Sequence, residues 1–386
     1  MKQCKWFPAM IVFLLGTLVL DACSFSVKVL STPTVSPPTE PSLPPTATPT
    51  SVAQTALLPS VTPTLISIRA DTIYMLEVFE SFELGDVVHS LAFTPDGTIL
   101  AAAGGNTDDF AIHLWKVASG QPLGTLDGHT GIVWGVAFSR DGQMLASVSS
   151  DKTAKIWDWR HGTLLKSLDF PGEVTSVSFS PDGQTLAVGG VDEPQNQIQN
   201  AAIWTFSVGS WRPLLKFPEY LNITAMAYSP NGRWLVGGGT SRNVQVWQAS
   251  DGASLFTFNH AHQVSKIALS PDSSNVATAT CETTVNDLCM EGGVWLWDLR
   301  TGKLIQKLKG FPDFVESVAF SVDGTSLIAA SRDGTLRVYA TSDYEPRFEA
   351  TLGGGIEALA LSPDGRLLST GGANGEVQLW KIVYHP

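Results

Sequence analysis

One five-residue phrase recurs seven times along the chain, and no other feature constrains the fold as strongly. Each copy lies between two stretches in which apolar and small residues alternate, as in VTSVSF before and TLAVGG after the third copy. Asp-Gly between such stretches predicts a β-hairpin, because Gly adopts the positive φ that the turn needs. The copies are FTPDG (93–97), FSRDG (138–142), FSPDG (179–183), YSPNG (228–232), LSPDS (269–273), FSVDG (320–324) and LSPDG (361–365). Their period predicts an array of similar β units.

An aromatic residue at the end of a further strand follows each of these turn phrases. These residues are Trp115, Trp157, Trp204, Trp247, Trp297, Tyr339 and Trp380. Together, the two marks resemble those of the WD-repeat family, whose four-stranded blades pack radially into a propeller. The resemblance covers residues 72–386. It implies an all-β fold, a seven-bladed β-propeller of four-stranded antiparallel blades, which we number one to seven in chain order.

The resemblance also implies a buried hydrogen-bond network in two of the blades. In the family, a His nine residues before the aromatic of the turn phrase joins a strand Ser or Thr, a turn Asp and the strand Trp. The matching residues are His129, Ser147, Asp151 and Trp157 in blade two. Blade five offers His260, Thr278 and Trp297, with no Asp at the matching spacing. We therefore expect all seven residues to be structural.

The order of strands within each repeat predicts how the ring closes. Every repeat begins with an outer strand, so the last blade lacks one after LWKIVYHP. The stretch from Thr72 to Leu84 has the position and the pattern to supply it. We expect this N-terminal strand, about 72–84, to complete blade seven, because closure removes exposed sheet edges.

Blades one, three and five carry insertions between their second and third strands, which places all three on one face of the ring. The sequences are GGNTDDF, GGVDEPQNQIQN and TCETTVNDLCMEGG, and none contains Lys or Arg. Their acidic residues are Asp108, Asp109, Asp192, Glu193, Glu282, Asp287 and Glu291. Two interpretations remain open. The loops are an ordinary acidic surface that favours solubility, or they form a face that attracts a basic partner or calcium.

The N-terminal 23 residues, MKQCKWFPAMIVFLLGTLVLDAC, have the pattern of a targeting segment. A basic end precedes an apolar run from Phe7 to Leu20, which is the length of a signal-peptide core and short for a membrane span. The tetrapeptide LDAC at 20–23 resembles the lipobox of bacterial lipoproteins, which implies cleavage before Cys23 and lipidation of Cys23. A plain secretory signal or an uncleaved anchor are the alternatives.

Residues 31–64 contain nine prolines and many Thr and Ser, a composition typical of an extended, unfolded tether. We therefore expect three parts: a signal peptide (1–22), a lipidated tether (23–70) and the propeller (71–386). The expected localisation is extracytoplasmic, anchored by lipid to a bacterial membrane.

Two cysteines remain once Cys4 is assigned to the signal peptide and Cys23 to the lipid. They are Cys281 and Cys289, in the longest insertion. In an oxidising compartment thiols pair, so we expect a disulfide. A zinc site lacks the usual ligand spacing, and a redox role lacks a CxxC motif.

The sequence contains no HExxH, GxSxG, GxxxxGK[ST] or CxxC motif, so we predict no enzymatic activity, metal site or cofactor. The net charge of −12 argues against nucleic-acid binding. The prediction is a monomeric, membrane-tethered scaffold that binds a protein or peptide, a basic one if the acidic loops are the contact. The alternative is a ligand-binding or hydrolytic propeller with a metal or small molecule in its central channel.

Overall fold

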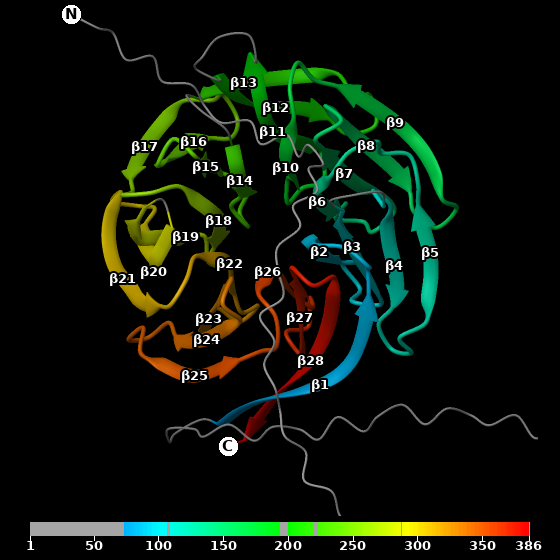
Figure 1. Ribbon diagram of the computed structural model, residues 1–386. Helices are drawn as coiled ribbons and strands as arrows, with labels where there is room; N and C mark the ends of the chain where they lie inside the picture. Colours follow the sequence, from blue (N-terminus) through cyan, green and yellow to red (C-terminus); the bar gives the residue numbers. More distant parts are fainter. Residues whose placement is uncertain (1–72, 106–108, 194–199, 220–222, 287, 386) are drawn as a thin grey trace, which may run out of the picture. The chain divides into compact units, whose positions relative to one another are not determined.

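The computed structural model describes residues 73–105, 109–193, 200–219, 223–286 and 288–385. In this part of the chain, 28 strands form seven four-stranded antiparallel sheets, arranged as the blades of a ring (Figure 1). The predicted all-β, seven-bladed propeller is confirmed. The two predicted N-terminal parts, 1–22 and 23–70, lie outside the described residues.

The first strand of every blade lies at the centre of the ring and the fourth at its rim (Figure 1). Blades one and two consist of β2 (Val88–Phe93), β3 (Ile99–Gly104), β4 (Ile112–Lys116) and β5 (Pro122–Leu126), then β6 (Val133–Phe138), β7 (Leu145–Ser149), β8 (Thr153–Asp158) and β9 (Thr163–Asp169). Blades three and four consist of β10 (Val174–Phe179), β11 (Thr185–Glu193), β12 (Asn200–Ser207) and β13 (Pro213–Glu219), then β14 (Ile223–Tyr228), β15 (Trp234–Gly239), β16 (Asn243–Gln248) and β17 (Ser254–Asn259).

The remaining blades follow the same order. Blade five consists of β18 (Val264–Leu269), β19 (Asn275–Val285), β20 (Leu288–Asp298) and β21 (Lys303–Phe311). Blade six consists of β22 (Val315–Phe320), β23 (Ser326–Ser331), β24 (Thr335–Ala340) and β25 (Pro346–Thr351). Blade seven combines β26 (Ile356–Leu361), β27 (Leu367–Gly372) and β28 (Glu376–His385) with β1 (Ile73–Glu83) from the other end of the chain.

Strand β1 closes the ring, as the sequence predicts. It pairs antiparallel with β28, from Ile73 opposite His385 to Glu83 opposite Glu376. Phe82 of β1 is 6% exposed and stacks on Trp115 of blade one at 4.9 Å between ring centroids. The closing strand therefore supplies backbone pairing to blade seven and apolar contact to its neighbour.

The turn phrases fold as local, self-capped turns. In blade two, Ser139 Oγ donates to Asp141 Oδ1 at 2.6 Å, and the same oxygen accepts the Gln143 backbone N–H at 3.0 Å. Gly142 has a φ of +66°, which a residue with a Cβ rarely adopts. The ideal Cβ position on Gly142 would lie 3.3 Å from Pro95 Cδ of blade one. The Gly of the phrase thus meets both a conformational and a packing requirement.

Among the described residues the core forms seven clusters, and each is shared by two neighbouring blades. Between blades one and two, for example, Ile112 packs with Leu145 and Trp157, all of which are at most 1% exposed. Burying a side chain of this size contributes about 1.5–3 kcal/mol. Because each blade is half of two cores, the blades stabilise one another around the ring.

Hydroxyl groups on the innermost strands add polar links between blades. Ser265 Oγ of β18 donates to the carbonyl of Val315 in β22 at 2.6 Å. Thr175 of β10 makes the equivalent bond to the carbonyl of Ile223 in β14. In β2 the direction is reversed, since Ser90 Oγ accepts the N–H of Val136 at 3.1 Å. These bonds fix neighbouring blades at their closest approach.

Candidate functional site

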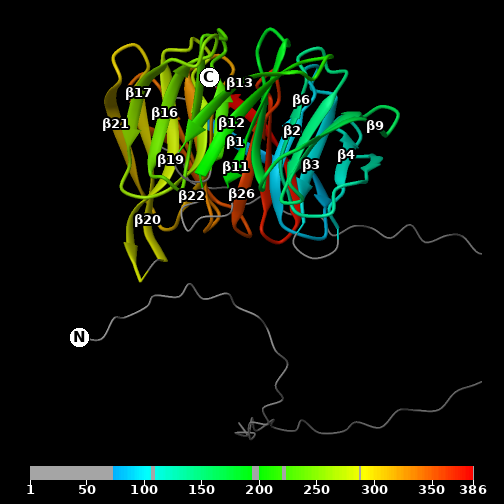
Figure 2. The same cartoon turned by 90° about the horizontal axis from the view of Figure 1, so that it is seen from above.

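The connections between blades and those between second and third strands emerge on one side of the ring, which we call the loop face. The turn phrases and the connections between third and fourth strands form the opposite side, the turn face. This follows from the antiparallel strand order of each sheet. The blade-five hairpin projects from the loop face beyond its neighbours, at the strand labelled β20 in Figure 2. The insertions in blades one and three occupy the same connection.

The projecting hairpin is the extension of β19 and β20. Each strand has 11 residues, whereas β7 and β8, which form the corresponding hairpin of blade two, have five and six. At ~3.3 Å per residue, the extra pairs extend the hairpin by about 15 Å. A disulfide joins Cys281 to Cys289 within this extension. The two cysteines singled out in the sequence therefore connect the two arms of one hairpin.

The base of this hairpin is fixed by a buried carboxylate. The Glu282 side chain is 4% exposed, accepts a hydrogen bond from Trp295 Nε1 and pairs with Lys309 Nζ at 3.1 Å. The hydrogen bond and charge of Glu282 raise the pKa of Lys309. Lys307 Nζ lies 3.3 Å from the centre of the Trp295 ring, a cation–π contact. Glu282, predicted as part of a partner-binding face, is a structural anchor.

Other acidic residues of the insertions also have side-chain partners in their own blade. Asp192 pairs with Lys216 Nζ at 2.7 Å, and Asp109 bonds His113 Nε2 at 3.0 Å. Asp108 and Asp287 lie outside the described residues, as does the side chain of Glu193, and Glu291 is half-buried. Two of the seven predicted carboxylates, those of Asp192 and Glu282, are therefore paired with a lysine of their own blade, and a third, that of Asp109, is hydrogen-bonded to a histidine. Sequence analysis missed these partners because they come from the third and fourth strands, outside the loops themselves.

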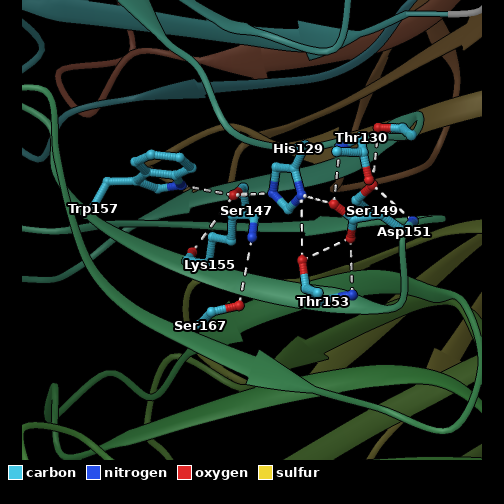
Figure 3. A network of polar contacts seen from close by, with 10 residues as sticks. His129, Thr130, Ser147, Ser149, Asp151, Thr153, Lys155, Trp157 and Ser167 are labelled. Atoms are coloured by element: carbon cyan, nitrogen blue, oxygen red, sulfur yellow. Dashed lines mark hydrogen bonds and ion pairs between the residues drawn. The ribbon is translucent and has the colours of Figure 1, made fainter.

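The predicted network of blade two is assembled in full (Figure 3). Ser147 Oγ lies 2.7 Å from His129 Nε2 and accepts the Trp157 Nε1–H at 2.9 Å. His129 Nδ1 lies 2.7 Å from Asp151 Oδ2, and Thr153 Oγ1 donates to Asp151 at 2.7 Å. Burial opposes ionisation of Asp151, but the hydrogen bonds from His129 and Thr153 outweigh it and hold its pKa well below the usual range. These contacts join strands β7 and β8, the turn between them and the connection that precedes β6, which is a structural role.

Blade five holds a shorter version of the same network. His260 Nε2 lies 2.8 Å from Thr278 Oγ1, which also accepts the Trp297 Nε1–H at 3.3 Å. In place of the missing Asp, His260 Nδ1 lies 3.3 Å from the carbonyl of Phe258. Burial lowers the pKa of His260 to about 4, so this imidazole is neutral at pH 7.

Ionisable groups gather on the innermost strands near the loop face, and sequence analysis did not single them out. Arg332, in the β23–β24 turn, pairs with Glu316 of β22, and its Nε lies 3.6 Å from Glu357 Oε1 of β26. Burial raises the pKa of Glu316 to about 7, and the charge of Glu357 adds to the shift while Arg332 opposes it. Glu316 and Glu357 are each the second residue of an innermost strand, and that shared position is the signal that could have found them.

The same strand position carries aromatic groups in blades one and two, next along the ring. His89 of β2 and Trp134 of β6 pack with ring centroids 4.5 Å apart.

Within the described ranges, no three His, Cys, Asp or Glu residues come together as a metal site. The same residues include no helix long and apolar enough to span a membrane.

A family model described as "WD domain, G-beta repeat" matches six segments, which together cover more than half of the chain: 78–116, 120–158, 162–193, 211–248, 302–340 and 347–381. The chain belongs to the WD40 repeat family. The model does not match residues 249–301 of this WD40 chain, although these form the outer strand of blade four and the first three strands of a complete blade five. Blade five, which carries the disulfide-linked hairpin, is therefore the blade that departs most from the family.

Curated relatives of this WD40 protein include subunit I of eukaryotic translation initiation factor 3. The protein of Drosophila sechellia is 27% identical over 286 residues, which span 69% of this chain and 86% of the relative. That of Drosophila grimshawi is 25% identical over 311 residues, 76% of this chain and 92% of the relative. The similarity thus extends over most of the propeller.

These relatives correct one expectation from the sequence. The expected localisation, lipid-anchored and extracytoplasmic on a bacterium, is wrong, because the relatives are subunits of a eukaryotic translation factor. That expectation rested on a pattern of few residues around a short apolar run, whereas the relatives match more than two-thirds of the chain. Cys23, the predicted lipidation site, lies outside the described residues.

Proposed function

We propose that this chain is a non-catalytic scaffold that holds a protein or peptide partner on its loop face. WD40 propellers suit protein binding, and the named relatives are each a subunit of a larger factor. The observation that carries the proposal is the blade-five hairpin, which projects from the ring on a buried anchor and a disulfide (Figure 2). A rigid projection is suited to binding, because little conformational entropy is lost when a partner docks.

The ring itself explains why a propeller serves this purpose. Seven shared cores hold the blades in fixed positions, so loops from blades far apart in the sequence form one surface. On that surface the charges of Asp192 and Glu282 are matched by Lys216 and Lys309. The proposed interface is therefore of mixed charge, and a strongly basic partner is not required.

Lysine cross-linking tests the proposal. The full chain is isolated under conditions that preserve its assemblies, treated with an amine-reactive cross-linker and analysed by peptide mass spectrometry. We expect the chain to sediment as part of an assembly, with cross-links to a partner from Lys216 and Lys309 of the loop face. Lys116 and Lys303, exposed at the turn face, are the matched controls. A chain that sediments alone, or that cross-links only through Lys116 and Lys303, contradicts the proposal.

A further inference from the structure

The tip of the blade-five hairpin is apolar, although its sequence has the composition of an acidic loop. Val285, Leu288 and Met290 are 55%, 69% and 55% exposed. Val285 lies directly opposite Leu288 across the hairpin, and Met290 follows two residues along, at the bulge where the register of β19 and β20 shifts. Exposed apolar side chains are unremarkable when scattered singly. Here three of them lie together at the end of a projection.

The hairpin is built to hold these side chains in place. Its two arms are joined by the Cys281–Cys289 disulfide, and Asn286 begins the tight turn with a φ of +51°, a conformation that Asn tolerates better than most residues. At its base, the ideal Cβ position of Gly292 would lie 2.1 Å from the carbonyl oxygen of Asp313, so the backbone of blade six packs directly against the hairpin. The projection is constrained at its base, along its length and at its turn.

A constrained apolar tip has the properties of a binding hot spot. Interfaces draw most of their affinity from a few side chains that enter pockets on the partner. Ordering such side chains in advance removes part of the entropic cost of association. On this basis we infer that Val285, Leu288 and Met290 insert as a unit into an apolar pocket of a protein partner. This inference rests on the proposed scaffold function and names the part of the loop face that makes the central contact.

The chemistry of the hairpin favours a protein pocket over a lipid surface. Segments that enter membranes carry Trp or Tyr at the interface and Lys or Arg toward anionic headgroups. Residues 281–291 contain no aromatic and no basic residue, but three acidic ones. The segment therefore offers an anionic headgroup no basic side chain, and one of its carboxylates, that of Glu282, is already paired with Lys309. A protein pocket lined by apolar side chains would complement the tip formed by Val285, Leu288 and Met290.

The first experiment locates the partner. A benzophenone amino acid is placed at position 288 of the full chain, and matched probes are placed at Leu165 on the outer strand β9 and at Val322 on the turn face, which are 50% and 51% exposed. We expect irradiation to yield a defined protein adduct from position 288 and none from the other two. Adducts formed equally at all three sites, adducts only with a second copy of this chain, or no adduct at all would overturn the inference.

The second experiment measures the contact with the purified adduct partner. Leu288→Ser should weaken its binding by about tenfold or more, as expected for a hot-spot side chain. Leu165→Ser, which removes an equally large exposed leucine elsewhere, should leave affinity unchanged. Equal thermal unfolding of both variants shows that the ring is intact. Unchanged affinity in Leu288→Ser would refute the role of the tip.

Sedimentation with vesicles of phosphatidylcholine and phosphatidylglycerol tests the lipid alternative. We expect the wild-type chain to remain in the supernatant, and vesicle binding that Leu288→Ser abolishes would overturn the inference in favour of a membrane. Failure of this inference is distinct from failure of the proposed function. If the chain sediments in an assembly that Leu288→Ser leaves intact, only the inference fails. If the chain sediments alone, both fail.

Discussion

Replacing His260 by Asn should change how the stability of the ring depends on pH. Burial of this imidazole lowers its pKa from 6.5 to about 4 in the folded protein. Below pH 6.5 the unfolded chain therefore binds a proton that the folded chain does not, and stability falls as the pH decreases toward 4. Each pKa unit corresponds to ~1.4 kcal/mol, so the shift removes about 3 kcal/mol of unfolding free energy over this window.

The total stability of the wild type would hide this effect. Burial raises the pKa of Glu316 to about 7, so protonation of the folded state at this site adds stability as the pH falls from 7 toward 4.5. The two contributions have opposite signs in nearly the same window. The informative quantity is the difference in unfolding free energy between wild type and His260→Asn, because Glu316 is present in both and cancels.

Urea unfolding between pH 4 and 7.5, followed by Trp fluorescence, provides that difference. We expect it to be largest above pH 6.5 and to decline by about 3 kcal/mol by pH 4. Ile267→Val is the matched control, because Ile267 belongs to the core cluster of Trp295 and Trp297, whose rings His260 contacts. It removes one methylene at a cost of about 0.5–1.5 kcal/mol, independent of pH. A His260→Asn difference that is equally flat would refute the burial argument, as would an imidazole that titrates by NMR near 6.5.

Three further predictions concern the ring and its hairpin. Trp157→Phe should lower the unfolding free energy by about 1–3 kcal/mol, because the buried Ser147 hydroxyl loses its indole N–H donor. An unchanged midpoint of urea unfolding would contradict this. Deleting residues 73–83 should lower the melting temperature of the whole ring, because blade seven loses its outer strand and the core loses Phe82. Loss of a buried Phe side chain costs about 3–5 kcal/mol. An unaltered transition in calorimetry would exclude this role for β1. Replacing both Cys281 and Cys289 by Ser should lower the unfolding free energy by up to about 2.5 kcal/mol, because the closed loop is lost. Backbone hydrogen exchange at Thr284 should then accelerate far more than exchange in β18. Equal acceleration at both places would show that the disulfide supports the ring rather than the hairpin.

The parts of the structure that depend on local sequence were predictable. The turn phrases fold through hydrogen bonds within five residues, as Ser139 and Asp141 show, so seven phrases define seven blades. The network of His129 and Trp157 recurs at fixed spacing in the family, and the structure assembles it at those positions. Ring closure followed from counting strands.

Contacts set by pairing between strands or blades were not predictable. Glu282 was assigned to an exposed acidic face, but the register of β20 and β21 brings Lys309 to it and burial removes it from solvent. The pairing of Arg332 with Glu316 and Glu357 depends on how blades six and seven pack, which no sequence spacing reveals. The apolar character of the hairpin tip was hidden by acidic neighbours, because composition does not say which side chains are exposed.

The pairing of β1 with β28 also has a consequence for biosynthesis. Glu83 and its partner Glu376 are about 300 residues apart, so the first strand leaves the ribosome long before its partner exists. At ~5–20 residues per second, this delay is about 15–60 s. During that time six blades can form while the seventh stays open, and its unpaired edge is a surface that chaperones can recognise. A nascent chain that terminates early keeps this edge indefinitely, so the closing strand distinguishes complete from incomplete molecules.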